Sequence, residues 1–230
     1  MKRLRATIIL GLVMVFGLSA CVTDEFGNKR PYTDAEKGVL IGAVGGAVLG
    51  GAVSKKKNRN KGVLIGAVGG GLAGGAVGMY MDKQKKDLEK TLAPEQSAGA
   101  IQIEKLPQHA LRIIMTEQTA FSVDSAEIKP RFYSTMDKIS TVLNRYGKTE
   151  LTIVGHTDST GSTQHNQTLS GARAQAVHNY FLQKGVVGER LESHGLGESA
   201  PRASNATADS RQLNRRVEIV IEPIVADQAG

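Results

Sequence analysis

The chain has 230 residues and a formal net charge of +7 at pH 7, with one cysteine and no tryptophan. A single cysteine excludes an intramolecular disulfide. Residues 100–230 carry 14 basic and 14 acidic side chains, so the positive charge lies in the first hundred residues and the remainder lacks the basic surface of a nucleic-acid-binding domain. We therefore expect no nucleic-acid partner.

Residues 1–20 have the plan of a secretory signal, with basic residues at the start, an apolar run over residues 8–18 and small residues before Cys21. The sequence LSAC, which ends at this cysteine, resembles the bacterial lipobox. The resemblance implies that Cys21 is acylated and becomes the mature N-terminus. Val22 follows in place of the aspartate associated with inner-membrane retention, which implies an outer-membrane lipoprotein facing the periplasm. The alternative is a signal with a chance cysteine.

The segment 21–36 is expected to be an N-terminal tether, and a glycine-rich repeat occupies 37–81. KGVLIGAVGGAVLGGAV at 37–53 recurs as KGVLIGAVGGGLAGGAV at 61–77. Glycines at every fourth position would form one bare stripe on a helix, which allows two helices to pack closely in an apolar environment. The repeat resembles the glycine-zipper segments of some bacterial outer-membrane lipoproteins. We expect a helical hairpin that associates with a membrane or with itself; the alternative is a flexible glycine tether.

The polar segment 82–100 is expected to be a linker with some helical content, and 101–230 a folded domain. IQIEK, LRIIM, LTIVG, RLESHG and RRVEIVIEP read as strands. Pro130 opens one helix; a second has Ser170 as its N-cap and Gly185 at its end. The residues expected on the buried faces of these helices are Phe132, Met136, Ile139, Leu143 and Tyr146 in the first, and Ala174, Val177 and Phe181 in the second. The pattern predicts an α+β domain whose helices cover one face of a small mixed sheet.

Four stretches carry a resemblance to a known family: FSVDSAEIKP, GHTDSTGS, NQTLSGARAQAVHNYF and NRRVEI. They are similar to the OmpA-like C-terminal domain, the peptidoglycan-binding module of outer-membrane proteins and lipoproteins, over about residues 108–223. Phe181 departs from the leucine usual in this family, which is an apolar exchange. The resemblance implies that the ligand is the diaminopimelate of the peptide stem. It also implies that Asp158 and Arg173 are the conserved aspartate and arginine of the site.

The chemistry of these two residues agrees with that ligand. Diaminopimelate has a free end with an ammonium and a carboxylate, which one anion and one planar cation can bind. Asp158 is predicted at a strand end and Arg173 in the first turn of the following helix. The alternative is an ordinary salt bridge between Asp158 and Arg173.

Four further residues are candidates for contacting the ligand. Thr157 and Asn166 are expected to order the loop through bonds to its backbone and to touch the ligand. Phe121 is expected at the edge of the pocket, although plain core packing is equally consistent with its position. Arg216 would add a second positive group, but a strand arginine is more often a solvated residue.

We expect no catalytic residue, no metal and no cofactor. The enzyme alternative is a zinc-dependent peptidoglycan hydrolase that uses His156, Asp158, His165 and His194, but no HxH, HExxH or CxxC spacing supports it. A third alternative is a membrane-active glycine-zipper protein whose C-terminal domain is a cell-wall clamp. The preferred hypothesis is an outer-membrane lipoprotein that binds peptidoglycan and tethers the outer membrane to the cell wall.

Overall fold

The computed structural model describes residue 72 and residues 76–225 of the chain. At its centre is a five-stranded sheet with the strand order β1-β2-β5-β3-β4. Strands β3 and β4 are parallel and the other neighbours are antiparallel, so the sheet is mixed. In chain order the elements are α3 (Val77–Thr91), α4 (Ala93–Ser97), β1 (Ile101–Lys105), η3 (Pro107–His109), β2 (Leu111–Thr116), α5 (Glu117–Ala120), η4 (Pro130–Phe132), α6 (Tyr133–Arg145), β3 (Thr149–His156), α7 (Thr163–Gln183), η5 (Gly188–Arg190), β4 (Leu191–Gly195), α8 (Ala208–Asn214) and β5 (Arg216–Pro223).

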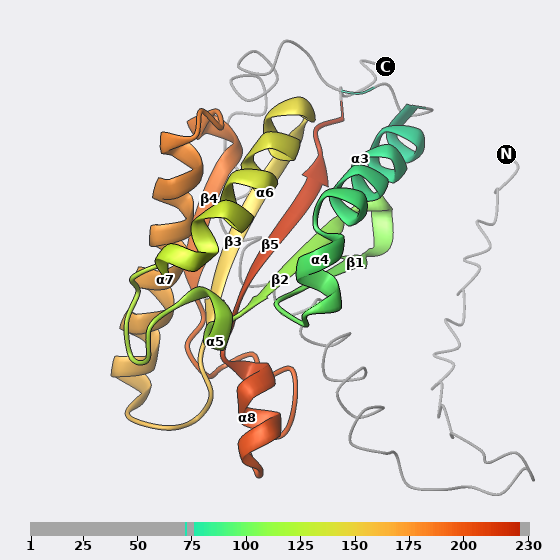
Figure 1. The fold of residues 1–230 in the computed structure, drawn as a ribbon. Coiled ribbons are helices and arrows are strands. Elements are labelled where there is room, and N and C mark those ends of the chain that lie inside the picture. The colour runs from blue at the N-terminus through green and yellow to red at the C-terminus, as the bar shows by residue number, and fades with distance from the viewer. Residues whose placement is uncertain (1–71, 73–75, 226–230) are drawn as a thin grey trace, which may run out of the picture. The chain divides into compact units, whose positions relative to one another are not determined.

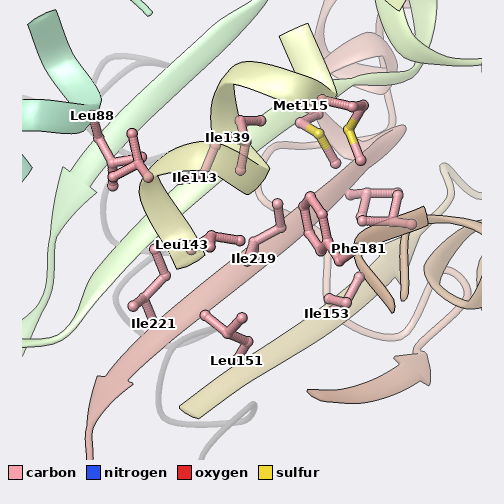
Figure 2. Packing of buried hydrophobic residues seen from close by; sticks show 14 of the residues in the cluster. Leu88, Ile113, Met115, Ile139, Leu143, Leu151, Ile153, Phe181, Ile219 and Ile221 are labelled. Atoms are coloured by element: carbon pink, nitrogen blue, oxygen red, sulfur yellow. The ribbon is translucent and has the colours of Figure 1, made fainter. Parts of the chain in front are cut away.

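Helices α3, α6 and α7 lie on one face of the sheet (Figure 1). Side chains alternate between the two faces of a strand. Leu151 and Ile153 of β3 and Ile219 and Ile221 of β5 therefore point to the helices, and all four are fully buried. Figure 2 shows them packed together with Phe181 of α7. The predicted α+β fold, with a small mixed sheet and helices on one face, is confirmed.

The predicted buried faces of the two long helices are also confirmed. The buried residues are Phe132, Met136, Ile139, Leu143 and Tyr146 around α6, and Ala174, Val177 and Phe181 in α7. Gly185 follows the end of α7 with φ of +82°, a left-handed conformation that suits a residue without a Cβ. The predicted glycine stop is therefore present.

The start of α7 differs from the prediction. Its N-cap is Ser162, whose side chain accepts a hydrogen bond from the backbone nitrogen of His165 at 3.2 Å. Ser170, the predicted N-cap, is buried in the middle of the helix. The polar run TQHNQT resembles a loop in composition, but it forms the first two turns of α7, where a mostly exposed surface needs few apolar residues.

Helix α7 connects the parallel strands β3 and β4 and packs very closely against both. A Cβ added to Gly155 in β3 would lie 2.0 Å from the carbonyl oxygen of Ser170, and one added to Gly195 in β4 would lie 2.4 Å from the nitrogen of Gly171. The Ser170 hydroxyl accepts a hydrogen bond from the backbone nitrogen of Gly197 at 2.9 Å. Only residues without a side chain allow this contact between helix and sheet.

The sequence predicts a linker with some helical content over residues 82–100. The helical content is present, since these residues form most of α3 and all of α4, but Leu88 and Leu92 are fully buried in the core, so the segment is packed on the domain. The hydroxyl of Tyr146, the residue that follows α6, donates a hydrogen bond to the carboxylate of Asp87 at 2.7 Å. A helix that buries about one apolar residue per turn keeps a polar average composition, and this explains why composition alone indicated a linker.

The signal (1–20), the tether (21–36) with Cys21, and most of the glycine-rich hairpin (37–81) lie outside the described residues. The last residues of that hairpin, from Val77 onward, begin α3. Within the part of the chain that the structure describes, no helix is both long enough and apolar enough to cross a membrane.

The packing of α3 generates a stability prediction. Leu88→Ala removes a fully buried side chain and should lower the free energy of unfolding by about 2–5 kcal/mol. Met79 of the same helix is 74% exposed, so Met79→Ala should change it by less than about 0.5 kcal/mol. Urea unfolding of the purified variants measures both values. Equal midpoints for Leu88→Ala and wild type would show that α3 is a detached linker.

Candidate functional site

Three strand ends meet at one edge of the sheet. Strand β5 lies between β2 and β3 and runs antiparallel to both. The register places Thr116, the last residue of β2, and His156, the last residue of β3, beside Arg216, the first residue of β5. The residues that follow β2 and β3 therefore come together with Arg215, which precedes β5. The topology thus collects side chains from three distant parts of the sequence.

Asp158 lies two residues after the end of β3 and is 5% exposed. Its Oδ1 accepts a hydrogen bond from the backbone nitrogen of Thr160 at 2.8 Å, and its Oδ2 accepts one from Nη1 of Arg215 at 2.6 Å. Burial on its own would raise the pKa of Asp158, but the hydrogen bonds from Arg215 and Thr160 hold that pKa below its ordinary value. The carboxylate is therefore anionic at neutral pH.

Arg173 lies in the middle of α7, not in its first turn as predicted, and is 1% exposed. Its Nε donates to the backbone oxygen of Ser125 at 2.9 Å, and its Nη2 donates to Oε1 of Glu117 at 2.5 Å. The guanidinium carbon is 5.5 Å from the centre of the Phe121 ring, a cation–π contact. Nη1 makes no hydrogen bond within the described residues, and this atom is not fully buried.

Arg215 joins the two predicted site residues through Glu117. Its Nε donates to Oε2 of Glu117 at 2.6 Å while its Nη1 donates to Asp158, which gives an ion-pair chain in the order Asp158–Arg215–Glu117–Arg173. Burial disfavours the charged form of Arg215, but Asp158 and Glu117 raise its pKa above the ordinary value. Asp158 and Arg173 thus belong to one cluster. They do not form the direct salt bridge that was the alternative prediction, because Arg215 and Glu117 lie between them.

The sequence identified Arg216 as the second cation, but the structure brings Arg215 to Asp158 instead. Arg216 is buried, and its Nε donates to Oε1 of Glu218 at 2.6 Å. Its Nη2 donates to the backbone oxygen of Ala200 at 3.2 Å. Successive side chains in a strand point to opposite faces. The sequence therefore predicted an arginine near the site but could not show whether Arg215 or Arg216 reaches Asp158.

Thr157, Asn166 and Phe121 all lie beside the ion-pair chain. Asn166 orders the loop, as predicted, because its Nδ2 donates to the backbone oxygen of Asp158 at 3.3 Å and to Oε2 of Glu198 at 2.6 Å. The prediction that Thr157 also orders the loop is wrong, because its hydroxyl is buried and has no hydrogen-bond partner among the described residues. Phe121 is 1% exposed and belongs to the core, while its ring also supports the Arg173 guanidinium.

The three histidines of the zinc alternative have separate surroundings. In the described residues, no group of three His, Cys, Asp or Glu side chains is placed to hold a metal ion. His156 is fully buried, and this burial lowers the pKa of its imidazole to about 3, so the ring is neutral. His165 contacts Asp124 at 2.8 Å, and His194 lies 3.5 Å from Glu192.

The ion-pair chain has hydrogen-bonding capacity that its own contacts do not use. An arginine side chain has five N–H groups, and among the described residues Arg173 donates two of them, to Ser125 and Glu117. Asp158 is a carboxylate with about four acceptor positions, of which two are filled by Thr160 and Arg215. Asp158 can therefore accept, and Arg173 can donate, further hydrogen bonds.

Comparisons with known proteins agree with the fold and the resemblance. Residues 120–215 match the OmpA family, and residues 1–82 match the YMGG-like Gly-zipper family. The "Probable lipoprotein YiaD" of Escherichia coli strain K12 is 35% identical over 219 residues, which cover 95% of this chain and 96% of that protein. The likeness to this relative therefore extends over nearly the whole of both chains.

Two other relatives match the C-terminal part. The "Peptidoglycan-binding protein ArfA" of Mycobacterium tuberculosis strain H37Rv is 39% identical over 114 residues, which are 50% of this chain and 35% of that protein. The structure of the cell wall anchor of the T6SS from Pseudomonas aeruginosa matches with a TM-score of 0.54 and 28% identity, over 59% of this chain and 96% of that one. The chain therefore belongs to the OmpA family, and its first 82 residues carry a YMGG-like glycine zipper.

Proposed function

We propose that this protein binds peptidoglycan non-covalently through the free end of diaminopimelate, and that a lipid on Cys21 anchors it to the outer membrane. It would then tether the outer membrane to the cell wall. The observation that carries the proposal is the ion-pair chain, which holds an anion, Asp158, and a planar cation, Arg173, at one edge of the sheet. The role is one of binding and requires no chemical step.

The free end of diaminopimelate carries an ammonium and a carboxylate on one carbon atom. In the proposed complex the ammonium donates to Asp158, and the carboxylate accepts from the unused N–H groups of Arg173. Charge-assisted hydrogen bonds of this kind contribute about 1.5–3 kcal/mol each. The buried hydroxyl of Thr157, which has no partner among the described residues, is next to Asp158 in the sequence and is a further candidate contact.

The relatives support this proposal through their names. One of them is named as a peptidoglycan-binding protein, and one solved structure is a cell wall anchor. The relative that matches along nearly its whole length is named as a lipoprotein, which supports the lipid anchor at Cys21. Self-association of the glycine zipper remains a prediction, since most of that segment lies outside the described residues.

The first test changes one group of the proposed pair at a time: Asp158→Asn removes the negative charge, and Arg173→Lys keeps the positive charge but removes the planar guanidinium. Asp158→Asn should weaken binding to purified sacculi by about 30- to 1,000-fold, because the ammonium loses its anion. Arg173→Lys should weaken it in the same range, because lysine keeps the charge but loses the planar fork. The double variant should be little worse than either single one, since both groups act on one ligand. Co-sedimentation at several protein concentrations measures these affinities.

Asp209→Asn and Arg131→Lys make the same chemical changes at exposed positions and serve as matched controls. Both should bind sacculi as the wild type does, and circular dichroism should show the same fold for all variants. Near-normal binding by Arg173→Lys would mean that a diffuse charge attraction, not a bidentate contact, holds the wall.

A second test changes the ligand instead of the protein. Wall whose peptide stems carry lysine in place of diaminopimelate keeps the glycan but lacks the carboxylate next to the ammonium. We expect the protein to co-sediment with diaminopimelate wall at least about 30-fold more tightly, because the contact with Arg173 is lost in lysine wall. Equal affinity for both walls would show that the site does not recognise diaminopimelate.

A third test concerns the anchor. Cys21→Ser should leave an unprocessed precursor that incorporates no labelled palmitate, whereas Ser19→Ala keeps a small residue before the cysteine and should be processed normally. Stable membrane attachment takes two acyl chains or more, so the Cys21→Ser protein should also lose its outer-membrane fractionation. Normal size and normal fractionation of this variant would contradict lipid anchoring at Cys21.

A further inference from the structure

Glu117 occupies the central position of the ion-pair chain, between its two arginines. Its Oε1 accepts from Nη2 of Arg173 and its Oε2 accepts from Nε of Arg215. Its backbone nitrogen donates to the backbone oxygen of Arg215 at 3.0 Å, which fixes the residue at the end of β2. Only 14% of the side chain is exposed. A partly buried carboxylate that uses both oxygens on guanidinium groups is held in one orientation.

This carboxylate decides the net charge of the cluster. Arg173 and Arg215 supply two positive charges, and Asp158 and Glu117 supply two negative charges, so the chain of four is neutral. Without Glu117 the same place would hold two guanidiniums and a single carboxylate. Such a cluster would attract any anion, because electrostatic interactions are stronger in a partly buried site than in water.

We propose that Glu117 is a specificity-determining residue: by keeping the cluster neutral, it makes the site prefer a ligand end that carries both an ammonium and a carboxylate over an end that carries a carboxylate alone. This inference rests on the proposed binding of diaminopimelate and names the feature of the end group that is selected. A zwitterionic end is neutral, so it enters a neutral cluster without leaving an excess charge. A purely anionic end would leave Asp158 facing an uncompensated carboxylate.

Two other acidic side chains lie near the site and stay constant in the test. Glu198 contacts Asn166 on the other side of the Asp158 loop, and Asp124 pairs with His165 at the surface. These groups are the same in every variant below. Their effect therefore cancels when the ratio of the affinities for two ligands is compared between one variant and another.

The test uses three soluble stem peptides that differ only in the free end of diaminopimelate. The first has the unmodified end, the second has its amine acetylated and is anionic there, and the third has its carboxyl amidated and is cationic there. Isothermal titration calorimetry with the full chain in detergent measures the affinity for each peptide. The wild type should bind the unmodified peptide most tightly.

Glu117→Gln removes one negative charge while keeping the shape of the side chain. The ratio of the affinity for the anionic peptide to that for the unmodified peptide should rise about tenfold. The ratio of the affinity for the cationic peptide to that for the unmodified peptide should fall about tenfold, because one negative charge is removed beside the ligand. Glu117→Asp keeps the charge and should leave both ratios at the wild-type values, even if all affinities fall. Glu127→Gln, at an exposed position in the following loop, should also leave them unchanged.

Arg215→Gln provides a second variant with the opposite sign. It removes a positive charge from the same chain, so it should shift the ratios toward the cationic peptide, and it keeps the inference testable if Glu117→Gln does not fold. Unchanged ratios in Glu117→Gln, or an equal shift in Glu117→Asp, would overturn the role of Glu117 and leave the proposed function standing. Failure of the wild type to bind any peptide would overturn the proposed function and this inference together.

Discussion

The contact on which the site depends is the close packing of α7 against β3 and β4. Gly155 and Gly195 leave room for the backbone of α7 at Ser170, and a single methyl group at either glycine would collide with that backbone. This contact fixes both the position and the rotation of the helix. Asn166 lies about one turn before it and contacts the backbone of Asp158, which follows β3, while Arg173 lies about one turn after it and contacts Glu117, which follows β2.

The second constraint is the strand order. Because β5 lies between β2 and β3 and runs opposite to both, its first residue is next to the last residues of the other two. Glu117, Arg215 and Asp158 meet there as neighbouring ion pairs of 2.6 Å. Removing charges from water is costly unless each charge has an opposite partner. The alternation of acid and base along the chain of ion pairs meets this requirement.

The folded domain begins earlier in the chain than the polar composition of residues 82–100 indicated. The match to the YMGG-like Gly-zipper family ends at residue 82, which is inside α3 (Val77–Thr91). The buried residues of α3 pack into the same core as the sheet. The zipper segment therefore leads directly into a helix of the folded domain, and no spacer occupies residues 82–100. In the proposed tether, this packed helix would transmit force between the membrane anchor and the wall-binding edge of the sheet.

The sequence alone determined the features that depend on local pattern. Alternation identified the strands, the spacing of apolar residues identified the buried faces of α6 and α7, and the motifs around Asp158 and Arg173 identified the family. Tertiary structure decided what depends on partners far away in the chain. Leu88 belongs to the core because α3 packs against other elements of the domain, and this packing is not visible in the sequence. The orientation of β5 determines that Arg215, and not Arg216, pairs with Asp158. Glu117 is 41 residues before Asp158, and no local pattern marked it, because its role arises solely from the sheet order that places the end of β2 beside the start of β5.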